Sequence, residues 1–152
     1  MKHGLGKMQY FGKGREGEYQ GYWENDRRHG EGVFVYKNGD VYSGWWRFGQ
    51  KHGKGTFVAK DTNMKMIGDW ENGEICRGRW VYPNGMYYEG EFVKNKPCGL
   101  GIWYCKNGNV VSGEYEQKKR EVDDEAPPEE EEEGAPVKSQ VELKWTSDQN
   151  LV

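Results

Sequence analysis

The sequence predicts an all-β protein, an elongated single-layer twisted antiparallel sheet built from tandem β-hairpins. Three observations predict this fold class. A short pattern, aromatic-x-Gly-x-aromatic, returns along the chain at nearly constant spacing. Apolar and polar residues around it alternate with the period of two that is typical of β-strands. Aromatic residues make up 14% of the 152 residues and 23 residues are Gly, whereas the hydrophobic fraction of 34% is too low for the aliphatic core of a helical bundle or an α/β enzyme.

The first half of each repeat is the aromatic-x-Gly-x-aromatic segment, which we expect to form the first strand of a hairpin. It begins at Tyr19, Tyr42, Met66, Tyr88 and Val111, at steps of 23, 24, 22 and 23 residues. Such regular recurrence predicts a repeat protein in which each unit depends on its neighbours for stability.

The second half of each repeat carries a glycine pattern, seen in full at His29-Gly30-Glu31-Gly32. Its last glycine recurs every 23 residues, at Gly32, Gly55, Gly78 and Gly101. In the third unit, Ile75 and Cys76 stand in place of His-Gly. A copy at His3 has no first half. The predicted repeat region is therefore 1–117, with a half-repeat at 1–18, repeats that start at residues 19, 42, 66 and 88, and a half-repeat from 111.

The second strand of each hairpin is expected to follow the last glycine of this pattern. Its aromatic positions, which share one face of the sheet, are Phe34, Phe57, Trp80 and Trp103. Asn-Gly pairs at 38–39, 84–85 and 107–108 connect successive units, and Asn-Gly tolerates a positive φ at both residues, so two-residue type I′ turns are predicted there. Residues 61–63 replace the pair in the third connection with one extra residue, which predicts a looser loop.

The glycines explain how so few aliphatic residues suffice. Twenty-two of the 23 lie before Glu114, and most fall on the strand face that carries the aromatic rings. Glycine has no Cβ, so a ring from a neighbouring strand can lie directly on its backbone. Each ring covered in this way buries about 150–250 Å². Packing of rings on glycine is therefore predicted to replace the aliphatic core.

The C-terminal residues have a different composition. Residues 118–134 hold three basic and nine acidic residues, which leaves a net charge of +3 on residues 1–117. We predict that 118–139 is a disordered acidic linker, because like charges and prolines dominate it. The segment 140–152 contains an alternating stretch, 141–146, that includes Trp145. This stretch is predicted either to dock as a short strand, on the sheet's own edge or on a partner, or to be a mobile tail.

No catalytic, cofactor-binding or metal-binding residues are predicted. The three histidines occupy equivalent repeat positions, about 10 Å apart where strands are spaced about 4.8 Å, so one zinc ion cannot bridge them. Residues 12–17 match GxGxxG, but a strand follows instead of the helix that would bind a pyrophosphate. The three cysteines form no CxxC pair and no secretory signal is present at the N-terminus, so an intracellular protein is expected.

An open sheet with an aromatic face predicts protein binding. An uncovered aromatic patch marks an interaction surface, and strand edges invite pairing with other subunits. The predicted partner-binding residues are Trp23, Trp46, Trp70, Phe92, Tyr115 and Trp145. Nucleic acid is not an expected partner, because residues 1–117 lack a concentrated basic patch.

The repeat resembles the MORN repeat. Tyr-x-Gly-x-Trp, His-Gly-x-Gly and the segment Tyr82 to Phe92 carry the resemblance, which extends over residues 1–115. The resemblance implies a non-enzymatic scaffold that binds other subunits of a large cytoskeletal assembly. The layout, with an acidic tail, is similar to flagellar and ciliary members such as the MORN subunits of the radial spoke head, which implies a location in the axoneme. The alternative is an adaptor that binds acidic phospholipids at a membrane surface.

Overall fold

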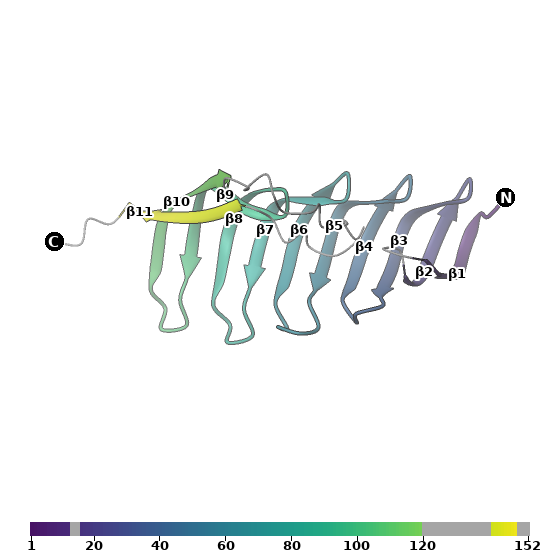
Figure 1. Ribbon diagram of the computed structural model, residues 1–152, viewed down its shortest axis with the longest axis horizontal. Coiled ribbons are helices and arrows are strands. Elements are labelled where there is room, and N and C mark those ends of the chain that lie inside the picture. The colour runs from purple at the N-terminus through teal and green to yellow at the C-terminus, as the bar shows by residue number, and fades with distance from the viewer. Residues whose placement is uncertain (13–15, 120–140, 149–152) are drawn as a thin grey trace, which may run out of the picture.

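The computed structural model describes residues 1–12, 16–119 and 141–148, and all regular structure in these residues is β-strand (Figure 1). The described strands form one open antiparallel sheet whose spatial order is the order of the chain. No helix in these residues could cross a membrane. The predicted fold class is confirmed. The strands are β1 (Gly4–Tyr10), β2 (Gly17–Glu24), β3 (Arg27–Tyr36), β4 (Val41–Arg47), β5 (Gln50–Val58), β6 (Lys65–Glu71), β7 (Glu74–Val81), β8 (Tyr87–Val93), β9 (Lys96–Tyr104), β10 (Val110–Lys119) and β11 (Val141–Ser147).

A single row of glycines crosses the sheet from β1 to β10. Each member pairs with the next, both within hairpins and between them. The row consists of Gly6, Gly21, Gly32, Gly44, Gly55, Gly68, Gly78, Gly90, Gly101 and Gly113. Because no member has a side chain, the row is a line along which strands can bend sharply and rings can approach the backbone.

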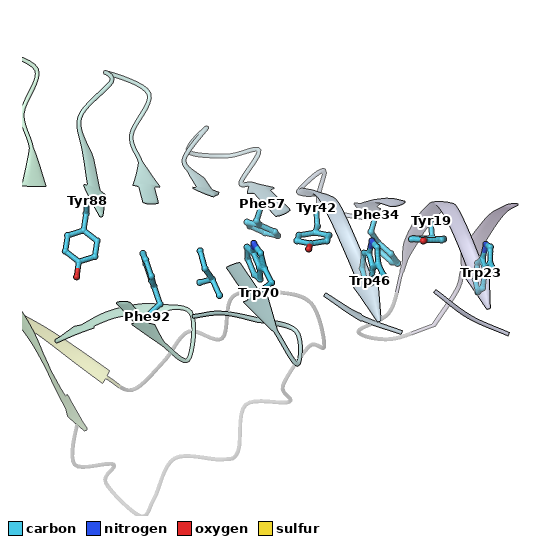
Figure 2. Packing of buried hydrophobic residues seen from close by; sticks show 10 residues of the cluster. Tyr19, Trp23, Phe34, Tyr42, Trp46, Phe57, Trp70, Tyr88 and Phe92 are labelled. Atoms are coloured by element: carbon cyan, nitrogen blue, oxygen red, sulfur yellow. The ribbon is translucent and has the colours of Figure 1, made fainter. Parts of the chain in front are cut away.

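Bulges next to this row bend the hairpins. Within three hairpins the register shifts directly after Gly21, Gly44 and Gly90, where the second strand carries two residues more than the first. A bulge increases the local twist and bends its strand. The sheet therefore curves around its aromatic side, so that in Figure 2 the ring of Tyr88 approaches from the upper part of the ribbon and that of Phe92 from the lower part.

The predicted packing of rings on glycine is confirmed. The rings of Tyr19, Tyr42 and Tyr88 are fully buried. A Cβ added at Gly32 would overlap the Tyr19 ring, and one at Gly55 would overlap the Tyr42 ring. The rings lie in a row along the inner side of the curved sheet (Figure 2). We call this side of the sheet the inner face and the opposite side the outer face.

The turns between successive units differ from the prediction. At 38–39, 84–85 and 107–108 only the glycine has a positive φ. In the first of these, Gly39 N–H donates to Tyr36 O at 2.9 Å and Tyr36 N–H to Asp40 O at 2.9 Å, which describes a type I turn followed by a left-handed glycine. The prediction of type I′ turns there is wrong. Turns with a positive φ at both residues lie instead within the hairpins, at 25–26, 48–49, 72–73 and 94–95.

The third hairpin, β6–β7, departs from the others. Its preceding connection, residues 59–64, is longer than the connections 37–40, 82–86 and 105–109, as predicted from residues 61–63. Ile75 pairs with Trp70, just as Arg28 pairs with Trp23, so Ile75 occupies the Arg28 position and not the histidine position. One residue of the His-Gly pair is therefore missing. In addition, Met66 replaces the buried tyrosine, and only backbone atoms lie nearest the added Cβ at Gly78.

The C-terminal strand docks on the protein's own sheet. β11 pairs with β10 over its full length, with Trp145 opposite Tyr115. The Trp145 ring lies against Gly113 and stands 4.8 Å from Tyr115, centroid to centroid. Of the predicted alternatives for 140–152, the structure forms the strand on the sheet's own edge, over 141–147. The predicted linker, 118–139, lies outside the described residues except for 118 and 119, which belong to β10.

Candidate functional site

The structure places most of the predicted partner-binding residues inside the fold. Trp23, Trp46, Trp70 and Phe92 are each exposed by 6% or less. The expectation that their rings form an open face is wrong, because the bent hairpins, the neighbouring rings and two cations cover them. Tyr115 and Trp145 are half-buried at the β11 end of the row. Partner binding by these six residues stays a prediction.

Hydrogen bonds and ring contacts fix the buried tryptophans. The indole N–H of Trp46 donates to Gly32 O at 3.1 Å, and that of Trp70 donates to Gly55 O at 3.0 Å. Tyr19 forms T-shaped contacts with Trp23 and Trp46, at centroid distances of 5.2 and 5.4 Å. A buried indole that is bonded in this way holds adjacent hairpins together. These rings are structural elements of the inner face.

Two basic residues, Arg28 and Lys51, complete the inner face, and the sequence reasoning missed their role. They occupy equivalent repeat positions, and each lies among four rings. Arg28 Cζ is 4.6 Å from the centroid of Trp46, and its guanidinium donates to Gly49 O at 2.8 Å. The other rings within 6 Å of Arg28 are Tyr10, Tyr19 and Phe34. The rings around Lys51 Nζ, at 5.4–5.5 Å, are Tyr36, Tyr42, Phe57 and Trp70.

Burial perturbs the acid–base properties of these groups. Burial, and secondarily the positive charge of Arg28, lower the pKa of Lys51 to about 8. Burial raises the pKa of Tyr36 to about 12 and raises that of Tyr42 still further. The tyrosines therefore stay neutral at physiological pH, and the negative faces of the rings are what favours a cation between them.

Exposed aromatic residues lie on the outer face instead. Tyr22 is 50% and Trp45 46% exposed, and they hold the same position in the first two hairpins. Each is bordered by a glycine of the next strand, since an added Cβ at Gly30 would lie 3.4 Å from Tyr22 and one at Gly53 would lie 3.5 Å from Trp45. Because these glycines have no side chain, the side of each ring that faces the glycine is left uncovered.

Two adjoining shallow depressions surround these rings. The first is lined by His3, Tyr22, Glu24, His29 and Glu31, among others. The second continues from His29 past Trp45 to Arg47, His52 and Lys54. We call the two depressions together the outer groove. Both are open to solvent, and in Asp69 the third hairpin has an acid at the position of the exposed ring, so the outer groove is confined to the first two hairpins.

The three histidines border the outer groove at equivalent positions. His29 Nε2 lies 3.2 Å from Glu24 Oε2, so this side chain pairs with a carboxylate and not with the backbone. Among the described residues, no group of His, Cys, Asp and Glu could hold a metal ion.

Charged pairs cover the middle of the outer face. Lys54 pairs with Asp69 at 2.5 Å, Arg77 with Glu91 at 3.0 Å, and Arg79 with Glu89 at 3.0 Å. These side chains are largely exposed, so each pair adds little stability. Lys54, Arg77 and Arg79 therefore already have acidic partners. Arg28 and Lys51 are enclosed by aromatic rings.

Comparison with known families finds three matches in the repeat region. Residues 19–41, 42–64 and 88–110 each match the family model of the MORN repeat. The unmatched interval, 65–87, contains the third hairpin, which lacks both the buried tyrosine and one residue of the His-Gly pair. No curated protein matches the chain significantly. MORN repeats indicate a protein-interaction or membrane-binding module, and proteins that contain them are generally non-enzymatic.

Proposed function

We propose that this protein is a non-enzymatic scaffold that binds other subunits of a large cytoskeletal assembly through the outer face of its MORN hairpins. The observation that carries the proposal is the outer groove, where exposed aromatic rings stand at equivalent positions on two successive hairpins. Half-exposed Trp and Tyr side chains are the residue types most enriched at binding hot spots. The depressions are shallow and open, a shape that suits a polypeptide better than an enclosed small molecule.

We further propose a place in the ciliary or flagellar axoneme, such as the radial spoke head. Tandem MORN hairpins with an acidic C-terminal segment support this, as the resemblance to flagellar MORN subunits implies. The position of β1 and β11 as the end strands of the described sheet supports assembly as well, because the end strands of a sheet are sites for strand addition.

Affinity purification of the full chain from ciliated cells tests the proposal. The tagged wild-type protein is expected to retain axonemal subunits, identified by mass spectrometry. A Tyr22→Ser/Trp45→Ser variant is expected to lose them, because it removes the exposed rings and leaves the inner face intact. Leu100→Ser, which alters an exposed apolar residue of β9, is the matched control. Recovery of no axonemal protein by the wild type would contradict the proposal.

Binding of acidic phospholipid is the competing outcome. Basic residues near a membrane surface contribute about 1 kcal/mol each. In this chain, however, Arg28 and Lys51 face aromatic rings and Lys54 pairs with Asp69. Co-sedimentation with vesicles of 30:70 anionic to neutral lipid at physiological salt separates the two functions. Pelleting that requires the anionic lipid would favour the membrane adaptor over the scaffold.

A further inference from the structure

The spacing of the outer groove restricts what can occupy it. Tyr22 lies on β2 and Trp45 on β4, with only β3 between them. Neighbouring strands are about 4.8 Å apart, so the two rings repeat at about 9.6 Å along the ribbon. An occupant that runs along the ribbon must therefore present equivalent side chains at this interval.

A polyproline II helix meets this requirement. It has three residues per turn and rises about 3.1 Å per residue, so residues i and i+3 face the same side about 9.3 Å apart. An extended β-strand also covers about 10 Å in three residues, but its residues i and i+3 point to opposite faces. Among extended conformations, polyproline II therefore matches both the interval and the direction.

The groove also supplies the groups that such a segment needs. A polyproline II backbone forms no internal hydrogen bonds, so its carbonyls are free to accept from a partner. The Trp45 indole and the Tyr22 hydroxyl are polar groups on half-exposed rings, where they can donate to these carbonyls. An α-helix has used its backbone carbonyls internally, so it would gain less from the same donors.

The charges at the two ends of the groove are opposite. The first depression carries Glu31 beside the Glu24–His29 pair, and the second carries Arg47 beside the Lys54–Asp69 pair. The opposite charges offered to a ligand are therefore those of Glu31 and Arg47. A segment with a basic residue at one end and an acidic residue at the other would complement both. Apolar residues three apart would fill the space beside the two rings.

We infer that the outer groove binds a proline-rich segment in the polyproline II conformation, with apolar residues at i and i+3 between a basic end and an acidic end. This inference rests on the proposed scaffold function, since it names the class of segment that the scaffold receives. Aromatic-lined grooves favour such segments because the ligand loses little conformational entropy on binding.

The test uses the full chain and three synthetic blocked peptides, with affinities measured by tryptophan fluorescence and NMR titration. The first is Lys-Pro-Pro-Leu-Pro-Pro-Leu-Pro-Glu. The second replaces every Pro by Gly or Ser and keeps the charges and the leucines. The third is an alanine-rich helical peptide with the same end charges and leucines seven residues apart, which is two helical turns.

The proline peptide is expected to bind at least about tenfold more tightly than either of the other peptides. Trp45→Ala and Tyr22→Ala are each expected to weaken it by about tenfold or more. Leu100→Ala is expected to leave its affinity unchanged. NMR spectra of each variant in the free state establish that the fold is retained.

Three results would overturn the inference: equal affinity for the Gly/Ser peptide, tighter binding of the helical peptide, or no effect of Trp45→Ala. The affinity purification separates this failure from that of the proposed function. If the wild type retains axonemal subunits and yet binds no proline peptide, the scaffold function stands and only the class of segment is wrong. If it retains none and binds no peptide, both are wrong.

Discussion

In the first two hairpins a basic residue pairs with the last aromatic residue of the repeat pattern: Arg28 lies opposite Trp23, and Lys51 lies opposite Trp46. In the next two hairpins an uncharged residue takes this place: Ile75 lies opposite Trp70, and Pro97 lies opposite Phe92. Whether this residue is basic or uncharged correlates with the type of aromatic ring that the next hairpin places against it. Arg28 and Lys51 lie against Trp46 and Trp70 of the following hairpins. After Ile75 and Pro97, the corresponding rings are those of Phe92 and Tyr115. Tryptophan attracts cations most strongly among the aromatic side chains, so the two ends of one ribbon pack the same position by different physical means.

The largest expected contrast concerns the buried tyrosine. Tyr42→Ala removes a fully buried ring that covers Gly55, and we expect it to lower the free energy of unfolding by about 3–5 kcal/mol. Met66→Ala removes the half-buried residue at the same position, and about 1–2 kcal/mol is expected. Urea titrations of both variants measure the difference. Equal losses would mean that the ring-on-glycine contact is not what distinguishes the hairpins.

The cation itself can be removed. Arg28→Ala loses contacts with four rings and the bond to Gly49 O, so we expect a loss of about 2–3 kcal/mol. Arg27→Ala is the matched control. Arg27 is the exposed neighbour of Arg28, so its substitution should leave the melting temperature unchanged. If the two substitutions have the same effect, the cation on the inner face has no stabilising role.

At the other end of the ribbon, β11 should stabilise the hairpins that lack a cation. Trp145→Ala uncovers Gly113 and the ring of Tyr115, with an expected loss of about 1–2 kcal/mol. Hydrogen exchange should become faster in β8, β9 and β10, because Trp145 also contacts Tyr88 on β8, and remain unchanged in β2 to β5, since each described strand is hydrogen-bonded only to its neighbours. Uniform acceleration along the ribbon would show instead that the sheet unfolds as one unit.

The lowered pKa of Lys51 predicts a pH dependence confined to the cationic end. The ammonium has an unperturbed pKa of 10.5, and in the folded protein the pKa is about 8. Between these values the unfolded chain holds a proton that the folded chain has lost, so stability rises with pH. The wild type should therefore gain stability relative to Lys51→Met between pH 7.5 and 9.5, as measured by urea titration. A constant difference would place the pKa outside this range.

The smallest expected effect would make the third hairpin more like the others. Met66→Tyr restores a ring near Gly68 and Gly78, and we expect a gain of about 0.5–1 kcal/mol. The gain is small because the missing residue of the His-Gly pair alters the bend at this hairpin. Thermal unfolding monitored by circular dichroism measures the change. Destabilisation would indicate that the shorter hairpin has no space for the ring.

Periodicity in the sequence was sufficient to predict the strands, their order and their inner and outer positions. Alternation over 141–146 also favoured a C-terminal strand, with a mobile tail as the alternative, and the structure forms a strand at 141–147. The turns could not be assigned in the same way. Asn-Gly favours a type I′ turn when only two residues are considered, but the structure forms that turn at pairs such as Phe48-Gly49, where strand length and the bulge decide the register.

The exposure of the aromatic residues could not be read from alternation. Alternation assigns a side chain to a face of the sheet but does not show that the sheet bends over that face. Trp46 was therefore predicted as a binding residue, whereas its neighbour Trp45 is the exposed ring. A usable signal did exist, because Lys2, Arg28 and Lys51 each precede a histidine and each lies within 6 Å of a Trp ring of the next hairpin.

The order of the strands has a mechanical consequence. When such a ribbon is stretched between its termini, the load reaches one hairpin at a time, because each described strand is hydrogen-bonded only to the strands that precede and follow it. Each released repeat of 23 residues would lengthen the tether by about 70 Å, the extended length less the two strand spacings of the folded repeat. The β6–β7 hairpin has neither a buried tyrosine over its glycines nor a cation enclosed by rings, so it should unfold at the lowest force. The mechanically weakest part of the ribbon would therefore lie near its centre.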